Sequence, residues 1–439
     1  LHDALPIYIQ VNWLAWVVNA YSLPYAVLMP LAGKLGDVFG PKKYFSVGLA
    51  ALSVGSAFAS ISPNFGVVLL GRLLQGIGAA FIYTNGLILV LETTPIERRG
   101  RILGLWSGSA AAGGVAGPVI GGFLLEIIEW RSVFLLLVLL ITLLLIFTLI
   151  VVSEKTTDKK QSFDVKGSVT LVIGMTILLL AISMGPDEGW FNPLVLVMTG
   201  ISFIALYLFY RTEKTAEAPM IQLGLFRNKT FSAAMVCGFI TNFTVIGTIF
   251  VMPIFLETVH GYSPSQVALL LAPVALSAAI IGPFGGWVSD KIGFFPPVGV
   301  GMFLRGLSFL FLSWLTPSTA YLFIFLTLLI NGIGLGLNNS PILSAAVSVS
   351  EHDDYGMTAG TYSMVQFIGG AIGVSISSVI VYSNMPQAEA LKNITGPVPG
   401  FAEAFLFLTL LCGIGFLASF LLRSASYSYQ QVKSSKIIH

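Results

Sequence analysis

Charged residues are scarce in this chain. Only 10% of its 439 residues are Asp, Glu, Lys or Arg, and 56% are hydrophobic, whereas soluble domains carry about 25% charged residues. A soluble protein of this composition would expose large apolar patches and aggregate. The composition therefore excludes an ordinary soluble protein and indicates an integral membrane protein.

Cysteine and histidine are also rare, with two cysteines and four histidines in the whole sequence. Cys237 and Cys412 both lie in apolar runs, which argues against a disulfide framework. No Cys/His cluster, phosphate-binding loop or Ser/His/Asp set is evident, so we expect no metal, no cofactor and no enzymatic activity. The net charge of +2 gives no reason to expect a nucleic-acid partner.

The sequence also lacks an initiator methionine and a secretory signal. Residues 1–7 resemble one reading frame of a common sequencing adapter, and such processing scars are left out of fold reasoning. We therefore expect the protein's own sequence to start near Tyr8, after an upstream segment that was lost.

Long apolar runs are what the chain has in abundance. A membrane-spanning helix needs about 20 mostly apolar residues. Such runs predict an all-α integral membrane protein with about thirteen visible helices, near residues 11–32, 44–62, 66–91, 101–125, 131–152, 167–184, 192–210, 231–255, 265–288, 296–315, 320–345, 358–382 and 401–422.

Basic residues cluster in alternate connections between these runs. The opposite set of connections holds only Arg131 and Lys392. The one exception to the alternation is the acidic connection 346–357, and acids count little in the positive-inside rule. The pattern predicts a multi-pass protein with a cytoplasmic C-terminus, whose first visible helix starts outside.

The two ends of the chain echo each other. Gln75-Gly76-Ile77-Gly78 returns as Asn331-Gly332-Ile333-Gly334, and Gly113-Gly114-x-x-Gly117 returns as Gly369-Gly370-x-x-Gly373, both 256 residues later. Further pairs at or near this offset are Gly100 with Gly356, Gly104 with Gly360, and Gly33-x-x-x-Asp37-x-x-Gly40 with Gly286-x-x-x-Asp290-x-x-Gly293. Parallel repeats in a membrane bundle indicate two similar halves that face a central site.

The repeat divides the chain into two six-helix halves related by a pseudo-two-fold axis. We expect the first half at 8–152, with its first helix absent, and the second at 211–423, followed by a cytoplasmic tail at 424–439. Residues 153–210 have no counterpart in the repeat and are predicted to form a charged linker and an inserted central helix pair.

The first candidate site is the segment 33–43, predicted to form a short cytoplasmic turn in which glycines permit close backbone approach. Asp37 is placed to meet a helix N-terminus or a nearby arginine. An ordinary charged turn would explain this segment alone, but its second copy favours a function. The residues concerned are Gly33, Gly36, Asp37, Gly40, Lys42 and Lys43, and in the second copy Gly286, Asp290, Lys291 and Gly293.

Arg72 lies deep within an apolar run, with Gln75 one helical turn later. An ionisable side chain at that depth is costly and usually faces a cavity or a partner. The alternative is a structural arginine neutralised by neighbouring carbonyl groups. Arg305 lies at a similar depth in the second half and leaves both roles open.

A third motif lies in the middle of the run 101–125. Small residues let helices touch closely, and Pro118 removes a backbone hydrogen bond and bends the helix. The motif predicts a surface on which a partner helix packs and slides, formed by Gly113, Gly117, Pro118, Gly121 and Gly122.

Polar and aromatic residues inside the apolar runs suggest the lining of a substrate cavity. Each one alone is better explained by hydrogen bonding between helices or by anchoring at the membrane interface. As a group they resemble a polyspecific pocket: Asn12, Trp16, Asn19, Tyr21, Tyr83, Asn85, Asn242, Phe243, Asn338, Tyr362 and Gln366.

These motifs resemble the fourteen-helix drug:proton antiporter branch of the major facilitator superfamily, over nearly all of residues 12–423. The segment 33–43 is similar to the signature loop of the superfamily. Leu70–Ala80 is similar to its fourth-helix motif, whose arginine is implicated in proton transfer. The antiporter motif of the fifth helix, which marks exporters, resembles Gly113–Gly122, and further matches are Trp16–Tyr21, Phe163–Gly167 and the inserted helix pair.

The sequence departs from this family in two places. The family's first helix, with its acidic residue, is absent, so the coupling carboxylate cannot be named. Val38 and Pro41 stand where the signature loop usually has basic residues, which thins its charge network.

The resemblance implies a proton-coupled antiporter that exports small amphipathic or cationic compounds by alternating access, as multidrug efflux pumps do. It implies Arg72 and Gln75 as proton-coupling residues, a plasma-membrane location, a monomer, and a small-molecule substrate and the lipid bilayer as partners. The alternatives are a monovalent-cation/proton antiporter, an importer or narrow-substrate transporter, and, in another class, a non-transporting membrane sensor or scaffold.

Overall fold

The computed structural model describes residues 11–127, 130–153, 163–216, 219–350, 354–385 and 395–423. The expected artefact at 1–7 and the expected tail at 424–439 lie outside these residues.

The described chain is helical throughout, and the predicted number of thirteen long helices is confirmed. Ten of the helices are long and apolar enough to cross a membrane by length and composition. The α-helices are α1 (Val11–Phe39), α2 (Pro41–Ser60), α3 (Phe65–Thr93), α4 (Arg99–Ile127), α5 (Arg131–Val151), α6 (Val165–Glu188), α7 (Pro193–Thr215), α8 (Lys229–Thr258), α9 (Pro264–Ile292), α10 (Phe295–Leu312), α11 (Tyr321–Val347), α12 (Tyr355–Asn384) and α14 (Phe401–Ser419), with short 3-10 turns η1 (Ile96–Arg98), η2 (Leu223–Arg227) and η4 (Phe420–Leu422).

The end of α1 differs from the sequence prediction. The helix continues to Phe39, so Gly33, Gly36 and Asp37 lie on its last two turns, and the prediction of a turn at these positions is wrong. Glycine is tolerated in an apolar helix because no water competes for its backbone hydrogen bonds. The chain reverses only at Gly40, whose φ of 99° suits glycine.

The second copy of this segment behaves in the same way. Helix α9 continues through Gly286 and Asp290 to Ile292. It ends at Gly293, whose φ is 93°. Both copies therefore present their aspartate from the end of a helix and not from a loop.

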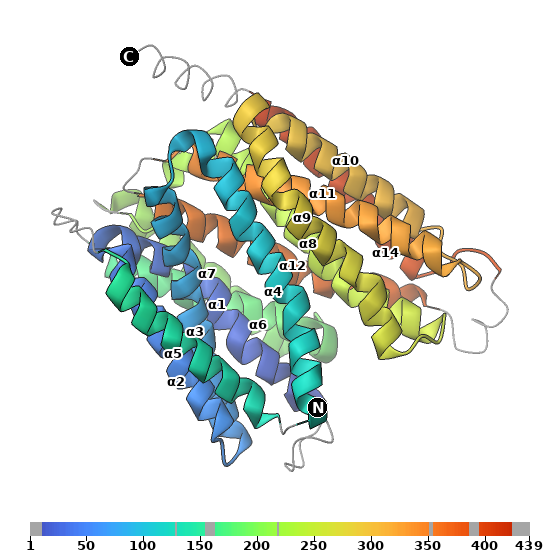
Figure 1. The fold of residues 1–439 in the computed structure, drawn as a ribbon, viewed down its shortest axis with the longest axis horizontal. Helices are drawn as coiled ribbons and strands as arrows, with labels where there is room; N and C mark the ends of the chain where they lie inside the picture. The colour runs from blue at the N-terminus through green and yellow to red at the C-terminus, as the bar shows by residue number, and fades with distance from the viewer. Residues whose placement is uncertain are drawn as a thin grey trace.

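The helices form two bundles (Figure 1). The first contains α1, α2, α3 and α5, and the second contains α8 to α12 and α14. Within the first bundle, α2 and α3 approach closely through glycine: a Cβ atom at Gly48 would lie 2.8 Å from the carbonyl oxygen of Gly78, and one at Gly55 would lie 2.6 Å from that of Gly71. Small residues allow such contact between membrane helices.

The boundary between the bundles is made by helices that pack on the opposite bundle. Helix α4 packs along α9, and α1 packs along α12, as the position of α4 between the bundles illustrates (Figure 1). Each half of the sequence repeat thus contributes two helices to the shared interface, α1 and α4 from the first half and α9 and α12 from the second.

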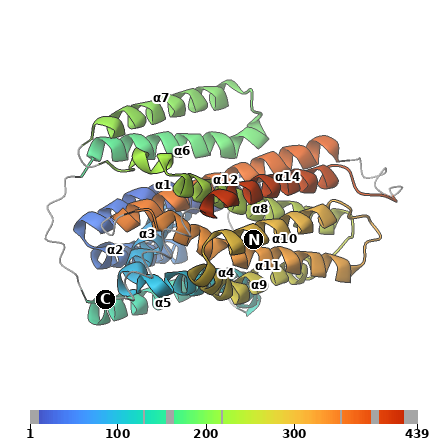
Figure 2. The same cartoon turned by 90° about the horizontal axis from the view of Figure 1, so that it is seen from above.

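The pair α6–α7 lies to one side of the bundles, next to α1 and α12 (Figure 2). The side chain of Asn19 on α1 donates a hydrogen bond to Ser183 on α6 at 2.9 Å. The hydroxyl of Ser375 on α12 donates to the carbonyl oxygen of Ile182 at 3.2 Å. The pair therefore covers one edge of the boundary between the halves.

Candidate functional site

Asp37 joins the end of α1 to the start of α12. Its carboxylate accepts hydrogen bonds from the backbone N–H groups of Gly356 at 2.9 Å and Met357 at 2.7 Å. Unpaired N–H groups and the helix dipole make the first turn of a helix a favourable place for a negative charge. Of the two partners predicted for Asp37, a helix N-terminus or an arginine, the structure shows the helix N-terminus. We call this contact the first clasp.

Asp290 makes the equivalent contact in the opposite direction. Its carboxylate accepts from the backbone N–H groups of Gly100 and Arg101 in the first turn of α4, both at 2.9 Å. We call this contact the second clasp. Because each clasp joins a helix of one half to a helix of the other, the two together close one end of the boundary.

The repeated glycines explain how the helices come close enough. A Cβ atom at Gly100 would lie 2.5 Å from both an Asp290 carboxylate oxygen and the carbonyl oxygen of Gly286. A Cβ atom at Gly356 would lie 2.5 Å from the carbonyl oxygen of Gly33 and 2.7 Å from an Asp37 carboxylate oxygen. Any side chain at either position would push the two halves apart.

The basic residues around the clasps have different contacts. Lys42 donates to the carbonyl oxygen of Leu149 at 3.3 Å, and the Lys43 ammonium lies 5.9 Å from the ring centre of Phe39. The Lys291 ammonium lies 4.0 Å from the ring centre of Trp287. Gly36 packs against Asn85, whose amide would overlap any side chain at position 36.

Arg72 and Gln75 lie together, as their spacing predicted. The Arg72 guanidinium donates to the Gln75 side-chain oxygen at 2.9 Å and to the carbonyl oxygen of Val17 on α1 at 2.9 Å, and it lies 4.5 Å from the ring centre of Tyr21. Gln75 donates in turn to Ser56 on α2 at 2.7 Å. This network joins α1, α2 and α3 within the first bundle and lies outside the lining of the central cavity.

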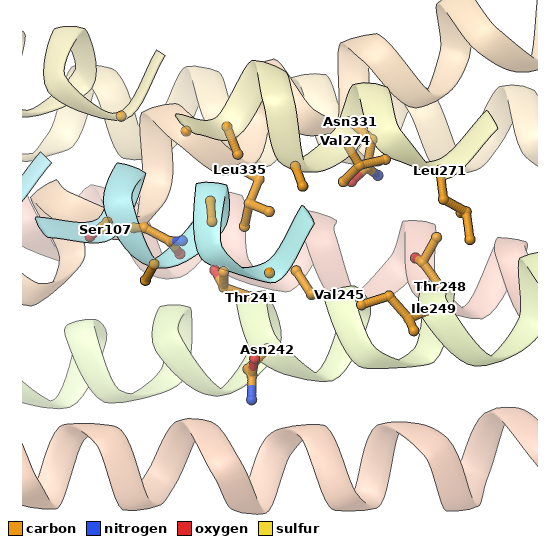
Figure 3. A pocket seen from close by; sticks show the side chains of 18 of the residues that line it. Ser107, Thr241, Asn242, Val245, Thr248, Ile249, Leu271, Val274, Asn331 and Leu335 are labelled. Atoms are coloured by element: carbon orange, nitrogen blue, oxygen red, sulfur yellow. The ribbon is translucent and has the colours of Figure 1, made fainter. Parts of the chain in front are cut away.

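A cavity of about 850 Å³ lies between the halves (Figure 3). Its walls come from α3 and α4 on one side and from α8, α9, α11 and α12 on the other. It extends along α9 toward Ser265, at the end of that helix opposite to Asp290. The cavity therefore extends toward the end of the boundary that lies opposite to the clasps.

The described lining of the cavity is apolar with scattered neutral polar groups, and no charged side chain belongs to it. Its polar and aromatic members are Tyr83, Trp106, Ser107, Thr241, Asn242, Thr248, Ser265, Asn331, Asn339, Tyr362 and Gln366. Apolar walls with a few oriented polar groups are typical of small-molecule sites.

Four of the predicted cavity residues are in this lining: Tyr83, Asn242, Tyr362 and Gln366. The Gln366 amide donates to the Tyr362 hydroxyl at 2.9 Å, and the Asn242 amide donates to the carbonyl oxygen of Gln366 at 2.8 Å. Asn242 accordingly points from α8 toward α12 (Figure 3). Tyr83 packs on Trp106, with ring centres 5.8 Å apart.

The other candidates serve packing between helices. Asn19 bonds to α6 as described above, Tyr21 lies against Arg72, and the Asn85 amide donates to the carbonyl oxygen of Ala32 at 3.1 Å. Phe243 and Asn338 are buried within the second bundle. Trp16 is outside the cavity lining, and the side chain of Asn12 lies outside the described residues.

Several lining residues were missed at the level of sequence, among them Trp106, Thr241 and Asn331. Asn331 opens the second copy of the Gln75–Gly78 motif, so the repeat itself gave a signal for it. Thr241 precedes the predicted Asn242, but a threonine in an apolar run does not by itself indicate a cavity. Which side of a helix faces a cavity depends on packing that the sequence does not display.

Two glycines of the α4 motif are not closely packed. A Cβ atom at Gly113 or Gly117 would meet nothing within 4 Å, so the predicted close helix contact is not made at these two positions. Its counterpart on α12 is closely packed, because a Cβ atom at Gly373 would lie 2.4 Å from the carbonyl oxygen of Phe243 on α8 and overlap with it. Pro118, Gly121 and Gly122 lie in α4, and their side-chain surroundings are outside the described residues.

Comparison with known proteins assigns the fold to a family. The family model described as Major Facilitator Superfamily matches residues 6–374. The chain belongs to the Major Facilitator Superfamily. Its membership identifies the chain as a multi-pass membrane transporter and not as an enzyme, and makes the cavity between its halves the candidate substrate site.

Relatives within the superfamily carry names from drug resistance. The chain is 30% identical to Multidrug resistance protein Stp of Mycobacterium tuberculosis, over 83% of this chain and 68% of that protein. It is 28% identical to Multidrug resistance protein 3 of Bacillus subtilis, over 83% and 72%. It is 30% identical to the Tetracenomycin C resistance and export protein of Streptomyces glaucescens, over 84% and 69%.

A solved structure has the same fold. The human organic anion transporter MFSD10 (TETRAN) superposes with a TM-score of 0.67 over 95% of this chain and 87% of that chain, at 16% sequence identity. At this identity the likeness concerns the architecture of the two bundles alone.

Proposed function

We propose that this transporter is a proton-coupled antiporter that exports small amphipathic compounds, including cationic ones, by alternating access. The observation that supports the proposal most is a cavity between two halves, one end of which is closed by two clasps that each join one half to the other. Rocking of the halves would break the clasps and open the cavity to the opposite side. The resistance and export functions in the names of its relatives support the choice of cargo.

The distribution of Lys and Arg supports an orientation for this state. The clasped end carries basic residues close to the helix ends, including Lys34, Lys42 and Arg101, and an excess of such residues marks the cytoplasmic side. In the proposal the clasped end and the C-terminus are therefore cytoplasmic, the cavity opens outward, and the protein works as a monomer in the plasma membrane.

Arg72 is the proposed proton-linked residue, together with Gln75. Its guanidinium lies within the first bundle, where it bonds directly to α1 and, through Gln75, is linked to α2. Ionisable residues at this depth in a membrane commonly mark proton or ion pathways. A difference of a few kcal/mol between inward and outward states is sufficient for such a coupled cycle.

Dye accumulation in drug-sensitive cells tests this function. The gene is expressed in cells that lack their own efflux pumps, and accumulation of a fluorescent cationic dye is followed with and without a proton uncoupler. We expect lower accumulation, abolished by the uncoupler and by Arg72→Ala. Unchanged accumulation over a broad panel of dyes and antibiotics, with normal membrane expression, would contradict multidrug export and favour a narrow substrate or cation exchange.

A further inference from the structure

Arg305 is a buried positive charge that the proposed cycle does not use. It lies on α10 with no exposed surface. Its Nη2 group donates to the carbonyl oxygen of Thr241 at 3.1 Å and to the hydroxyl of Thr244, both on α8. Its Nε and Nη1 groups are buried without a hydrogen-bond partner among the described residues.

The position of Arg305 is fixed by α11. A Cβ atom at Gly334 would lie 2.6 Å from Cγ of Arg305, so the stem of the arginine occupies the space that a side chain at position 334 would need. Arg305 is thus held between α8 and α11, directly behind Thr241.

The cavity wall offers two further unused donors, one of them on Thr241, whose carbonyl oxygen accepts from Arg305. Thr241 and Asn331 both line the cavity, from α8 and α11 (Figure 3). The Thr241 hydroxyl and the Asn331 amide nitrogen are buried without a hydrogen-bond partner among the described residues. Buried polar groups are normally paired, so unpaired ones need an explanation.

The charge balance of the site favours one class of ligand. The described lining holds no carboxylate that could neutralise Arg305, and an unpaired charge in a membrane interior is costly. A ligand that carries one negative charge would satisfy the donors and the charge together, since guanidinium and amide N–H groups bind carboxylates through strong charge-assisted hydrogen bonds.

We propose that Thr241, Asn331 and Arg305 form a binding subsite for a monovalent anion, either the carboxylate of an amphipathic cargo or a chloride ion. Thr241 and Asn331 make the first contact from the cavity wall, and Arg305 supplies the charge from behind them. The inference narrows the chemical class of the cargo of the proposed exporter. Binding of a cargo carboxylate rests on the proposed export function, whereas binding of chloride does not.

Binding of a matched pair of compounds to the purified protein tests the subsite. 1-Naphthoate and its neutral amide, 1-naphthamide, have the same shape and differ in charge. Isothermal titration calorimetry should show naphthoate bound at least about tenfold more tightly than naphthamide. Arg305→Gln should remove this preference without weakening naphthamide binding, while Arg305→Lys, which keeps the charge, should retain part of it.

A second variant controls for misfolding of the first, and a second anion tests the alternative ligand. Thr241→Val removes the hydroxyl at nearly constant volume and leaves the backbone carbonyl that Arg305 needs, so it should lower the preference several-fold in a folded protein. Chloride, titrated against sulfate at constant ionic strength, should compete with naphthoate. Stabilisation of the wild-type protein by chloride, without any preference for naphthoate, would assign the subsite to the free ion.

Equal binding of the acid and the amide by the wild-type protein, with no effect of chloride, would overturn the proposal. So would a preference for naphthoate that survives both Arg305→Gln and Thr241→Val. These outcomes are separate from the dye assay: efflux of dye without anion preference would refute only the subsite, and anion binding without any efflux would refute only the export function.

Discussion

The two clasps have the same central geometry and different surroundings. In both, an aspartate at a helix end accepts two backbone N–H groups from the first turn of a helix in the other half. Around the first clasp, Lys34 forms an ion pair with Asp354 at 3.5 Å. The corresponding positions of the repeat hold Trp287 and Arg98, which cannot form such a pair.

The surroundings of the first clasp reach the inserted helix pair. Gln222, in the segment after α7, donates to Asp354 at 2.7 Å. That segment is held to α7 by Glu213, whose carboxylate accepts from the N–H groups of Met220 at 3.0 Å and Ile221 at 3.3 Å. The repeat therefore preserves the two aspartate contacts that close the boundary. The contacts that connect α6–α7 to the closed end surround the first clasp only.

The largest effect is expected from a side chain placed inside a clasp. In Gly286→Ala the new methyl group would overlap the carbonyl group of Gly100, and overpacking of this kind costs about 1–3 kcal/mol. The population of molecules in which the clasped end is open should rise by about 5- to 150-fold. The distance between spin labels at the exposed positions Glu97 and Ile292 should increase accordingly. Gly200→Ala, in open space on α7, is the matched control, and an unchanged distance in Gly286→Ala would show that the glycine contact does not hold the closed state.

Loss of either aspartate charge should have a smaller effect, similar for the two clasps. Asp37→Asn and Asp290→Asn keep one acceptor oxygen but lose the charge at the helix N-terminus, which is worth about 1–2 kcal/mol in a partly buried geometry. Spin-label distances across the closed end should report a comparable increase in the open population for both. A large effect of one variant beside no effect of the other would break the equivalence of the clasps.

The sequence predicted this closed end better than it predicted the cavity. Repeated glycines and an aspartate at fixed spacing were sufficient to narrow the partner of Asp37 to a helix N-terminus or an arginine, because a charge near an apolar run has few ways to be satisfied. The sequence could not show that the helix whose N-terminus meets Asp37 belongs to the other half of the chain.

The cavity depended on the rotation of each helix about its axis. Tyr83 and Asn85 are two residues apart on α3, and both were predicted to line the cavity. Tyr83 does so, whereas Asn85 turns toward α1 and bonds to Ala32. Depth in the membrane can be read from an apolar run, but the direction of a side chain is decided by the neighbouring helices.

A change at Asp354 should separate the clasps. Asp354→Asn removes the ion pair with Lys34 and weakens the bond from Gln222, at a cost of about 1 kcal/mol for a largely buried pair. Hydrogen exchange should become faster at the amides of Met220, Ile221 and Gly356 and stay unchanged at Gly100. Equal acceleration at Gly100 would mean that the two clasps open only together.

The smallest effect should come from a hydroxyl that supports only the second clasp. Ser340 donates to the carbonyl oxygen of Gly100 at 2.6 Å, a bond between the halves. Its counterpart in the repeat, Thr84, donates to Ala80 at 3.0 Å and to Met29 at 3.4 Å, both within the first half. Ser340→Ala should therefore raise the open population by a few-fold, as expected for the loss of one neutral hydrogen bond of about 0.5–1.5 kcal/mol.

Thr84→Val is the matched control for Ser340→Ala, because it removes an equivalent hydroxyl whose bonds do not cross the boundary. Its effect on the spin-label distance should be zero, although it can lower the thermal stability of the first bundle. A similar opening in both variants would mean that packing within a half, and not the bonds between the halves, sets the population of the closed state.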